Sequence, residues 1–250
     1  MKKILIMLLA VVMLLSLVAC NDKPETPDEG QGGNQANLEG KATFEYDIVT
    51  GDNAVITKFN GSYDDKKVEV PAEIDERRVV GIGAQAFYYN NAIEEVILPD
   101  TVKTIDNHAF AGCAFLKSIT IPDSVTSIGA FAFTGCVSLS AIDLPASLKT
   151  IGDAAFHGCT ALAELKLPDS LEEIGDIAFW GCTKLTSVEF PASVKTIGDQ
   201  AFYECSALAS VKLTKEIEKI GAIAFHKCAE GIAFDAPADS YAAKYIEENY

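Results

Sequence analysis

The chain has 250 residues, 49% of them hydrophobic, and its 36 acidic residues against 20 basic ones give a formal net charge of −16. This excess of carboxylates argues against binding to nucleic acid or docking on anionic lipid, because both need a positively charged protein surface. The excess negative charge is typical of a well-solvated surface and is compatible with binding to a basic partner.

Residues 1–19 have the pattern of an export signal. Met1-Lys2-Lys3 is a basic start, residues 4–18 are an apolar run, and Leu17-Val18-Ala19-Cys20 ends it. The arrangement resembles a bacterial lipoprotein signal, whose removal leaves a diacylated Cys20 at the start of the mature chain. An uncleaved anchor and a plain secretory signal are the alternatives. We therefore expect an exported protein, lipid-anchored to the cell membrane or cell surface. No later segment has the ~18 apolar residues of a spanning helix.

The lipidated Cys20 opens a predicted disordered tether over 20–37, which is rich in Pro, Gly, Asp, Glu and Asn and has no aromatic residue. Residues 38–67 do not fit a repeat. They contain two alternating segments on either side of Gly51-Asp52-Asn53, which is typical of a β-hairpin. We expect this hairpin to cap the open end of the hydrophobic core that follows.

A 23-residue repeat dominates residues 68–234. Phenylalanine recurs at this interval at Phe87, Phe110, Phe133, Phe156, Phe179, Phe202 and Phe225. Each is preceded by Ala, and each has an Ile five residues earlier that is followed by Gly, except at Asp106. A Cys follows three residues after each Phe, except at Asn90. A fixed period of about 20–30 residues indicates one small unit stacked on copies of itself.

Each unit contains an alternating segment such as 116–121, in which Ile119 faces inward and Pro122 ends a short half-buried strand. Successive strands are expected to stack as a parallel sheet on one face of a solenoid, at a spacing of ~4.8 Å. Segments such as 152–156 are predicted to be short helical turns on the other face, with Asp153 as N-cap.

The unit pattern Leu-x-x-Ile-x-Leu-Pro-x-x-Leu-x-x-Ile-Gly-x-x-Ala-Phe-x-x-Cys resembles the BspA-type leucine-rich repeat of bacterial and protist surface proteins. The resemblance covers 68–234 and implies an α/β leucine-rich-repeat solenoid, a right-handed stack capped at both ends. We expect the second cap over 235–250, where 240–248 fits a helix. The family is associated with adhesion to host matrix proteins and to other cells, so the resemblance also implies adhesion or recognition.

The six cysteines of the repeat share one column, so stacked neighbours would have parallel Cβ vectors, which is poor geometry for a disulfide. We interpret them as small buried hydrophobic residues with weak hydrogen-bonding power. A line of thiols does not make the tetrahedron that zinc prefers, so we predict no metal site and no cofactor. Asp153, Asp176 and Asp199 also share a column. Clustered carboxylates can hold Ca²⁺, but helix capping accounts for the same residues.

The histidines do not form a catalytic set. His157 and His226 lie three repeats apart, His108 lies in another column, and none has an obvious nucleophile or carboxylate partner. The glycines recur with the repeat and do not form a phosphate-binding loop. We therefore predict that the protein is not an enzyme.

Two rows of variable residues are candidate ligand-binding surfaces. The first is the outward side of the predicted strands, since solenoid faces commonly bind extended partners. Its candidate residues are Glu95, Ser118, Thr120, Asp143, Glu164, Lys166, Glu189 and Lys212. The second row follows each Phe, and its neighbours Trp180 and Tyr203 would make an aromatic hot spot. The alternatives are unconstrained surface variation in the first row and packing of the rings between repeats in the second.

These features favour a monomeric cell-surface lipoprotein whose solenoid binds a protein or glycan ligand, on host matrix or on another cell. A structural cell-envelope protein that organises its neighbours is one alternative. A nutrient-binding lipoprotein is another, and the absence of a cleft between two lobes disfavours it.

Overall fold

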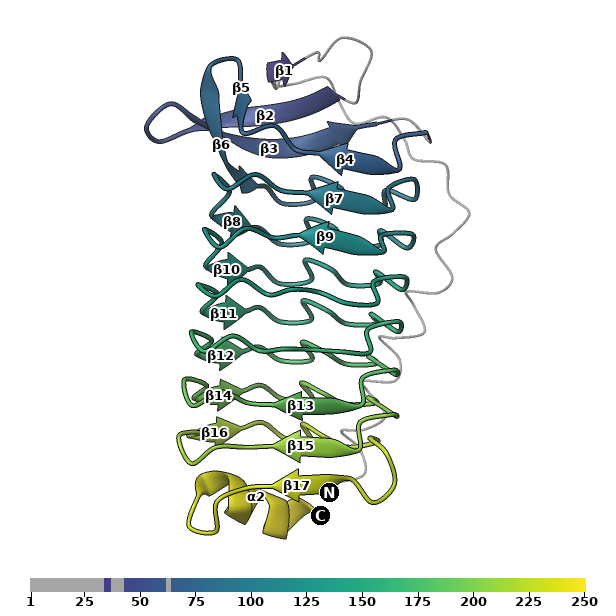
Figure 1. Ribbon diagram of the computed structural model, residues 1–250, viewed down its shortest axis with the longest axis vertical. Helices are drawn as coiled ribbons and strands as arrows, with labels where there is room; N and C mark the ends of the chain where they lie inside the picture. The colour runs from purple at the N-terminus through teal and green to yellow at the C-terminus, as the bar shows by residue number, and fades with distance from the viewer. Residues whose placement is uncertain (1–33, 37–42, 62–63) are drawn as a thin grey trace, which may run out of the picture. The chain divides into compact units, whose positions relative to one another are not determined.

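The computed structural model describes residues 34–36, 43–61 and 64–250. The predicted signal peptide over 1–19, Cys20 and the first part of the predicted tether lie outside the described residues. From β6 (Arg77–Ile82) onward the described chain winds in stacked coils, with a β-hairpin beside the first coil and a helix beside the last (Figure 1). In the described part of the chain, no helix has the length and apolar character needed to span a bilayer.

A column of short parallel strands runs through the stack (Figure 1). Its members are β6 (Arg77–Ile82), β8 (Thr104–Ile105), β10 (Ser127–Ile128), β11 (Thr150–Ile151), β12 (Glu173–Ile174), β14 (Thr196–Ile197) and β16 (Lys219–Ile220). The isoleucine that ends each strand pairs with the isoleucine 23 residues later, beginning with Ile82 and Ile105. This register confirms the 23-residue coil. Each recurring isoleucine ends a strand, because a β-branched residue packs well on a pleated, half-buried surface.

The strand row predicted around 118–120 is divided into two three-stranded parallel sheets. One sheet contains β4 (Lys67–Glu69), β7 (Glu95–Ile97) and β9 (Ser118–Thr120), and the other contains β13 (Ser187–Glu189), β15 (Ser210–Lys212) and β17 (Ala233–Asp235). The two coils between them have no strand at 141–143 and 164–166, although Ile142 and Leu165 are buried there. One buried side chain is enough to hold each of these coils in the stack. A parallel β-ladder also requires the backbone N–H and C=O groups of neighbouring coils to be in register.

The predicted hairpin is formed by β2 (Thr43–Val49) and β3 (Asn53–Asn60), which pair antiparallel. It joins the solenoid because β3 pairs in parallel with β6. Phe59 extends the phenylalanine column, with its ring centroid 5.4 Å from that of Phe44 and 5.0 Å from that of Phe87.

Two further strands border this hairpin. At residues 34–36, where a disordered tether was predicted, strand β1 (Asn34–Ala36) pairs antiparallel with β2. As an edge strand, β2 would leave a row of backbone N–H and C=O groups without partners. Residues 34–36 pair with these groups in an extended conformation, and this pairing forms a strand despite their polar composition. β5 (Glu73–Ile74) pairs antiparallel with β6 across Asp75 and Glu76, whose φ values of 48° and 64° suit a two-residue hairpin turn.

The segments predicted as helical turns are consecutive β-turns instead. We call them the turn segments and the surface they form the turn face; they are residues 83–90, 106–113, 129–136, 152–159, 175–182, 198–205 and 221–228. In segment 152–159, the N–H groups of Ala154, Phe156 and Gly158 donate to carbonyls of the next coil at 2.7–2.8 Å. Ala154 and Gly158 have left-handed φ values of 53° and 71°, which a right-handed helix does not allow. The next coil therefore supplies acceptors that a helix would find within itself.

Phenylalanine and cysteine form two of the repeated columns in the core. The rings of Phe110, Phe133, Phe156 and Phe179 are fully buried, and successive centroids lie 5.2 Å apart with nearly parallel planes. Each repeat cysteine donates its thiol to a phenylalanine carbonyl of the preceding coil, as Cys159 does to Phe133 at 3.2 Å. The cysteines are free and all but the last are buried, which confirms the predicted column of buried thiols.

The buried thiols are expected to be unreactive. Burial raises the pKa of Cys113 and Cys182 to about 12, and a thiol reacts through its thiolate. Iodoacetamide at about pH 8 should therefore label none of the five buried cysteines in the folded protein and all of them in urea. Peptide mass spectrometry of a Cys20→Ser variant would measure this without interference from Cys20. Equal labelling of Cys159 in folded and denatured protein would contradict the assigned column.

The helix α2 (Tyr241–Asn249) packs against the last coil. It begins one residue later than predicted, because the Ser240 hydroxyl accepts the N–H of Ala243 at 3.0 Å and acts as N-cap. Tyr245 is buried, and its hydroxyl accepts the N–H of Ala224 at 3.1 Å. In other coils the equivalent N–H donates within its own turn segment, as that of Ala155 does to Gly152 at 3.2 Å, and in the last coil the helix supplies the acceptor.

Candidate functional site

The outward residues of the divided strand row form an exposed, charged surface, which we call the strand face. Ser118, Thr120, Asp143, Glu164, Lys166, Glu189 and Lys212 are exposed, and Glu95 is half-buried. Lys67 lies 3.2 Å from the carboxylate of Glu95, and Lys212 pairs with Glu189 in the neighbouring coil. Exposed pairs of this kind contribute about 0–1 kcal/mol, so they orient these side chains more than they stabilise the fold.

Two of the predicted strand-face residues line a common hollow. Asp143 and Lys166 border a cavity of about 350 Å³ together with Asp169. It lies beside 141–143 and 164–166, the two coils without an assigned strand. The structure therefore brings these two candidates together; Glu164 lies in the same coil as Lys166, and the other five lie along the coils on either side.

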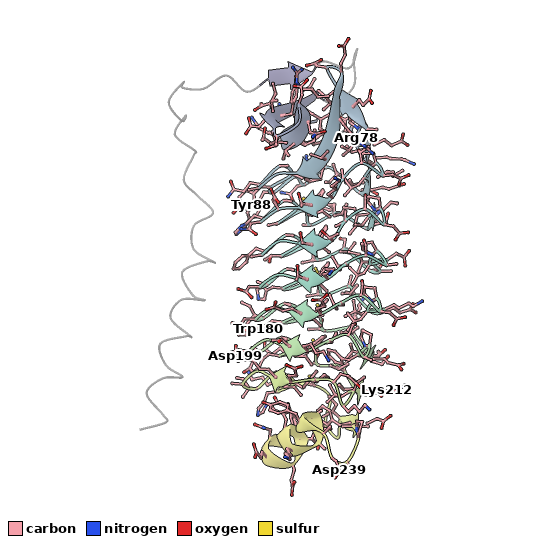
Figure 2. The ribbon with its side chains drawn as sticks, turned by 90° about the vertical axis from the view of Figure 1, so that its left-hand side faces the viewer. Arg78, Tyr88, Trp180, Asp199, Lys212 and Asp239 are labelled. Carbon is pink, nitrogen blue, oxygen red and sulfur yellow. The ribbon has the colours of Figure 1, made fainter. Side chains whose placement is uncertain are left out.

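The predicted aromatic pair lies on the turn face. The ring centroids of Trp180 and Tyr203 are 4.7 Å apart. Figure 2 shows Trp180 on the opposite side of the stack from Lys212, so the predicted site residues belong to two separate surfaces.

Both rings of this pair have partners within the protein. The indole N–H of Trp180 donates to the carboxylate of Glu204 at 3.1 Å, and the ammonium of Lys227 lies 4.9 Å from the centre of the Tyr203 ring. Lys227 also pairs with Glu204 at 2.8 Å and holds the pKa of that carboxylate below its ordinary value. Both rings are half-buried. This arrangement favours packing between coils, since the polar groups beside the rings are already engaged.

The turn face carries a second aromatic group, in which only Tyr88 belongs to the predicted row after each Phe. It contains Tyr88, Tyr89, His108 and Phe131, and we call it the tyrosine cluster. Tyr88 and Tyr89 are 46% and 62% exposed, and their ring centroids lie 4.6 Å apart, edge to face. His108 stacks on Phe131 at 4.8 Å and lies 6.3 Å from Tyr88. Figure 2 shows Tyr88 on the same side of the stack as Trp180.

Tyr89 lies at a position where four of the six later coils have glycine and the last two have Glu204 and Lys227. The glycines are Gly112, Gly135, Gly158 and Gly181, and all six equivalent residues have left-handed φ. Tyr89 has a φ of 52°, a conformation that costs a side-chain-bearing residue about 1–2 kcal/mol. A Cβ on Gly112 would lie 2.7 Å from the Tyr89 ring, so the missing side chain there makes room for it. Tyrosine at a glycine position was the sequence signal for this cluster.

Two adjoining cavities border the tyrosine cluster. The first has a volume of about 550 Å³ and is lined by Tyr88, Tyr89, Gln85 and Asn91, among others. The second, of about 410 Å³, shares Tyr88, Tyr89 and Asn91 with the first and extends to His108 and Phe131. Both volumes lie within the range of about 300–1,000 Å³ that is usual for small-molecule sites.

The predicted aspartate column joins successive coils rather than capping helices. Asp153 accepts the N–H of Asp176 at 2.8 Å, and Asp176 accepts that of Asp199 at 2.7 Å. Each carboxylate thus satisfies a backbone donor 23 residues further on. In the described ranges, no group of three or more His, Cys, Asp or Glu side chains is arranged to hold a metal ion.

A family model supports the predicted resemblance. The model described as the BspA type leucine rich repeat region matches residues 80–183 and 131–241, with six copies. The two matches together cover more than half of the chain. The chain belongs to the BspA-type leucine-rich repeat family. The coils described above are therefore leucine-rich repeats.

Solved structures of bacterial leucine-rich repeat proteins resemble this one. The leucine rich repeat protein of T. pallidum is 30% identical, with a TM-score of 0.70 over 83% of this chain and 94% of that chain. The pneumococcal vaccine antigen PcpA is 18% identical, with a TM-score of 0.46 over 84% of this chain and 72% of that one. A leucine-rich repeat protein from Bacteroides ovatus is 21% identical, with a TM-score of 0.37, covering 77% and 70%. A search of curated proteins finds no match.

Proposed function

We propose that the protein is an exported, lipid-anchored recognition protein whose leucine-rich-repeat solenoid binds a protein or glycan ligand, as an adhesin or recognition module. One observation carries the proposal: the buried columns repeat almost unchanged from coil to coil, whereas the exposed residues of the strand face and turn face differ. Because the exposed side chains do not take part in core packing, they can be specialised for a partner without loss of stability. Catalysis has no part in this function.

Anchoring follows from the sequence of the first 20 residues. A diacylated Cys20 would hold the chain at a membrane, and the polar residues after it would separate the solenoid from the lipid headgroups. Two acyl chains suffice for stable anchoring, whereas one gives only marginal binding. The solenoid would then act as a monomer that presents both faces to a ligand on host matrix or on another cell.

The test compares cells that produce the protein with a strain that lacks its gene. Producing cells should adhere more strongly to at least one member of a panel of immobilised matrix proteins, glycans and partner cells. The matched control is Cys20→Ser, which should release the protein into the medium while the purified protein still binds the same panel member. Equal adhesion of the producing and lacking strains across the whole panel would reject the proposal. Crosslinking in intact cells to a single abundant envelope protein would favour the structural alternative.

A further inference from the structure

We propose that the tyrosine cluster and its two adjoining cavities form a binding site for a neutral oligosaccharide. The inference rests on the proposed recognition function and names the ligand class and the surface that takes it. Tyr88, Ala111 and Thr134, which line the cavities, belong to the row predicted after each Phe, whereas Tyr89 does not.

The arrangement of the two cavities fits a linear oligosaccharide. The two cavities share Tyr88, Tyr89 and Asn91, so the tyrosines stand at their common border. With volumes of about 550 and 410 Å³, each hollow has the size of a small-molecule site rather than of a flat protein interface. A ligand that fills both must extend past the tyrosines, as consecutive sugar units would.

The side chains that line the cavities match the two kinds of surface on a sugar. A pyranose has apolar C–H faces, which pack on aromatic rings, and a hydroxyl rim, which needs both donors and acceptors. Exposed Tyr88 and Tyr89 supply the rings. Gln85 and Asn91 are exposed at the cavity walls, and each amide supplies donors and an acceptor.

The charge of the residues that line the two cavities favours a neutral sugar over a charged ligand. Although the chain has a net charge of −16, no Asp, Glu or Arg is among the lining residues of the two cavities that the structure describes. The one Lys there, Lys58, lies 3.3 Å from the carboxylate of Glu45. An anionic polysaccharide would need unpaired cations and a basic partner would need carboxylates, as in the strand-face cavity with Asp143.

The experiment measures binding of purified full-length Cys20→Ser protein to cellohexaose, maltohexaose, mannohexaose and the anionic polygalacturonate by isothermal titration calorimetry. At least one neutral hexasaccharide should bind, and polygalacturonate should not. Tyr89→Gly should weaken that binding by about tenfold or more without lowering the melting temperature, because it restores the glycine of the later coils. Tyr89→Phe should retain most of the affinity, and Tyr241→Ala, an exposed tyrosine on α2, should retain all of it.

Three results would overturn the site. They are no binding of any neutral hexasaccharide, binding of polygalacturonate alone, and binding that Tyr89→Gly leaves unchanged. If the hexasaccharides fail but the adhesion panel still gives a ligand, the sugar site is rejected and the proposed recognition function stands. If both fail, the recognition function is rejected as well.

Discussion

Phe156→Ala should lower the free energy of unfolding by about 3–5 kcal/mol. The ring is fully buried between Phe133 and Phe179, with centroids 5.2 Å away on each side. Its removal takes away the hydrophobic contribution of the ring and leaves a cavity in the column. The neighbouring coils cannot close this cavity without breaking the hydrogen bonds that space them, such as Phe156 N–H to Ala178 at 2.7 Å.

Urea unfolding followed by circular dichroism would measure this loss. The matched control is Phe115→Ala, because Phe115 is 54% exposed on the same type of coil and should change the free energy of unfolding by less than about 0.5 kcal/mol. A loss below about 1 kcal/mol for Phe156→Ala would contradict the assignment of the phenylalanine column to the core.

Gly152→Ala should lower the free energy of unfolding by about 1–3 kcal/mol through overpacking. A Cβ at this position would lie 2.7 Å from the backbone N of Ala130 and from the carbonyl carbon of Gly129. Backbone atoms cannot rotate away as a side chain can, so the two coils must separate. Their separation would lengthen the hydrogen bond from the Gly152 N–H to Ile128, now 2.9 Å.

The same column contains the control for this prediction. Asp106 is exposed and already has a side chain where the other repeats have glycine, so Asp106→Ala should cost less than Gly152→Ala. Thermal unfolding of both variants in one buffer gives the comparison. Equal melting temperatures for Gly152→Ala and the parent chain would show that the glycine column does not mark a close approach of the coils.

The pattern of the repeat was enough to predict the coil, its core and the state of the cysteines. The Phe and Cys positions represented by Phe156 and Cys159 recur every 23 residues, which indicates stacked coils. A side chain at such a position is covered by the equivalent side chains of the coils before and after it. The period also placed the hairpin outside the repeat, because 43–60 alternates as strands and has no Phe or Cys at the 23-residue interval. The family resemblance followed from the same columns.

The candidate site was predicted only in part. Exposure of the strand face followed from alternation within each unit, and Asp143 and Lys166 do meet at a cavity. Tyr88 belongs to the predicted row after each Phe, but its grouping with Tyr89 was missed because it depends on contacts between coils: the Tyr89 ring has room only because Gly112, one coil later, lacks a side chain.

The sequence by itself determined which residues are inside, because burial in a stack depends on the period alone. Only the tertiary structure decided what the backbone does between the columns. Asp153 ahead of Ala155 and Phe156 has the local pattern of a capped helical turn, yet the segment is a series of β-turns. In segment 152–159 every second N–H from Ala154 to Gly158 finds its acceptor more than 20 residues away, in the adjacent coil, while the N–H groups between them bond three residues back. Such partners exist only after stacking, so no local pattern could have predicted them.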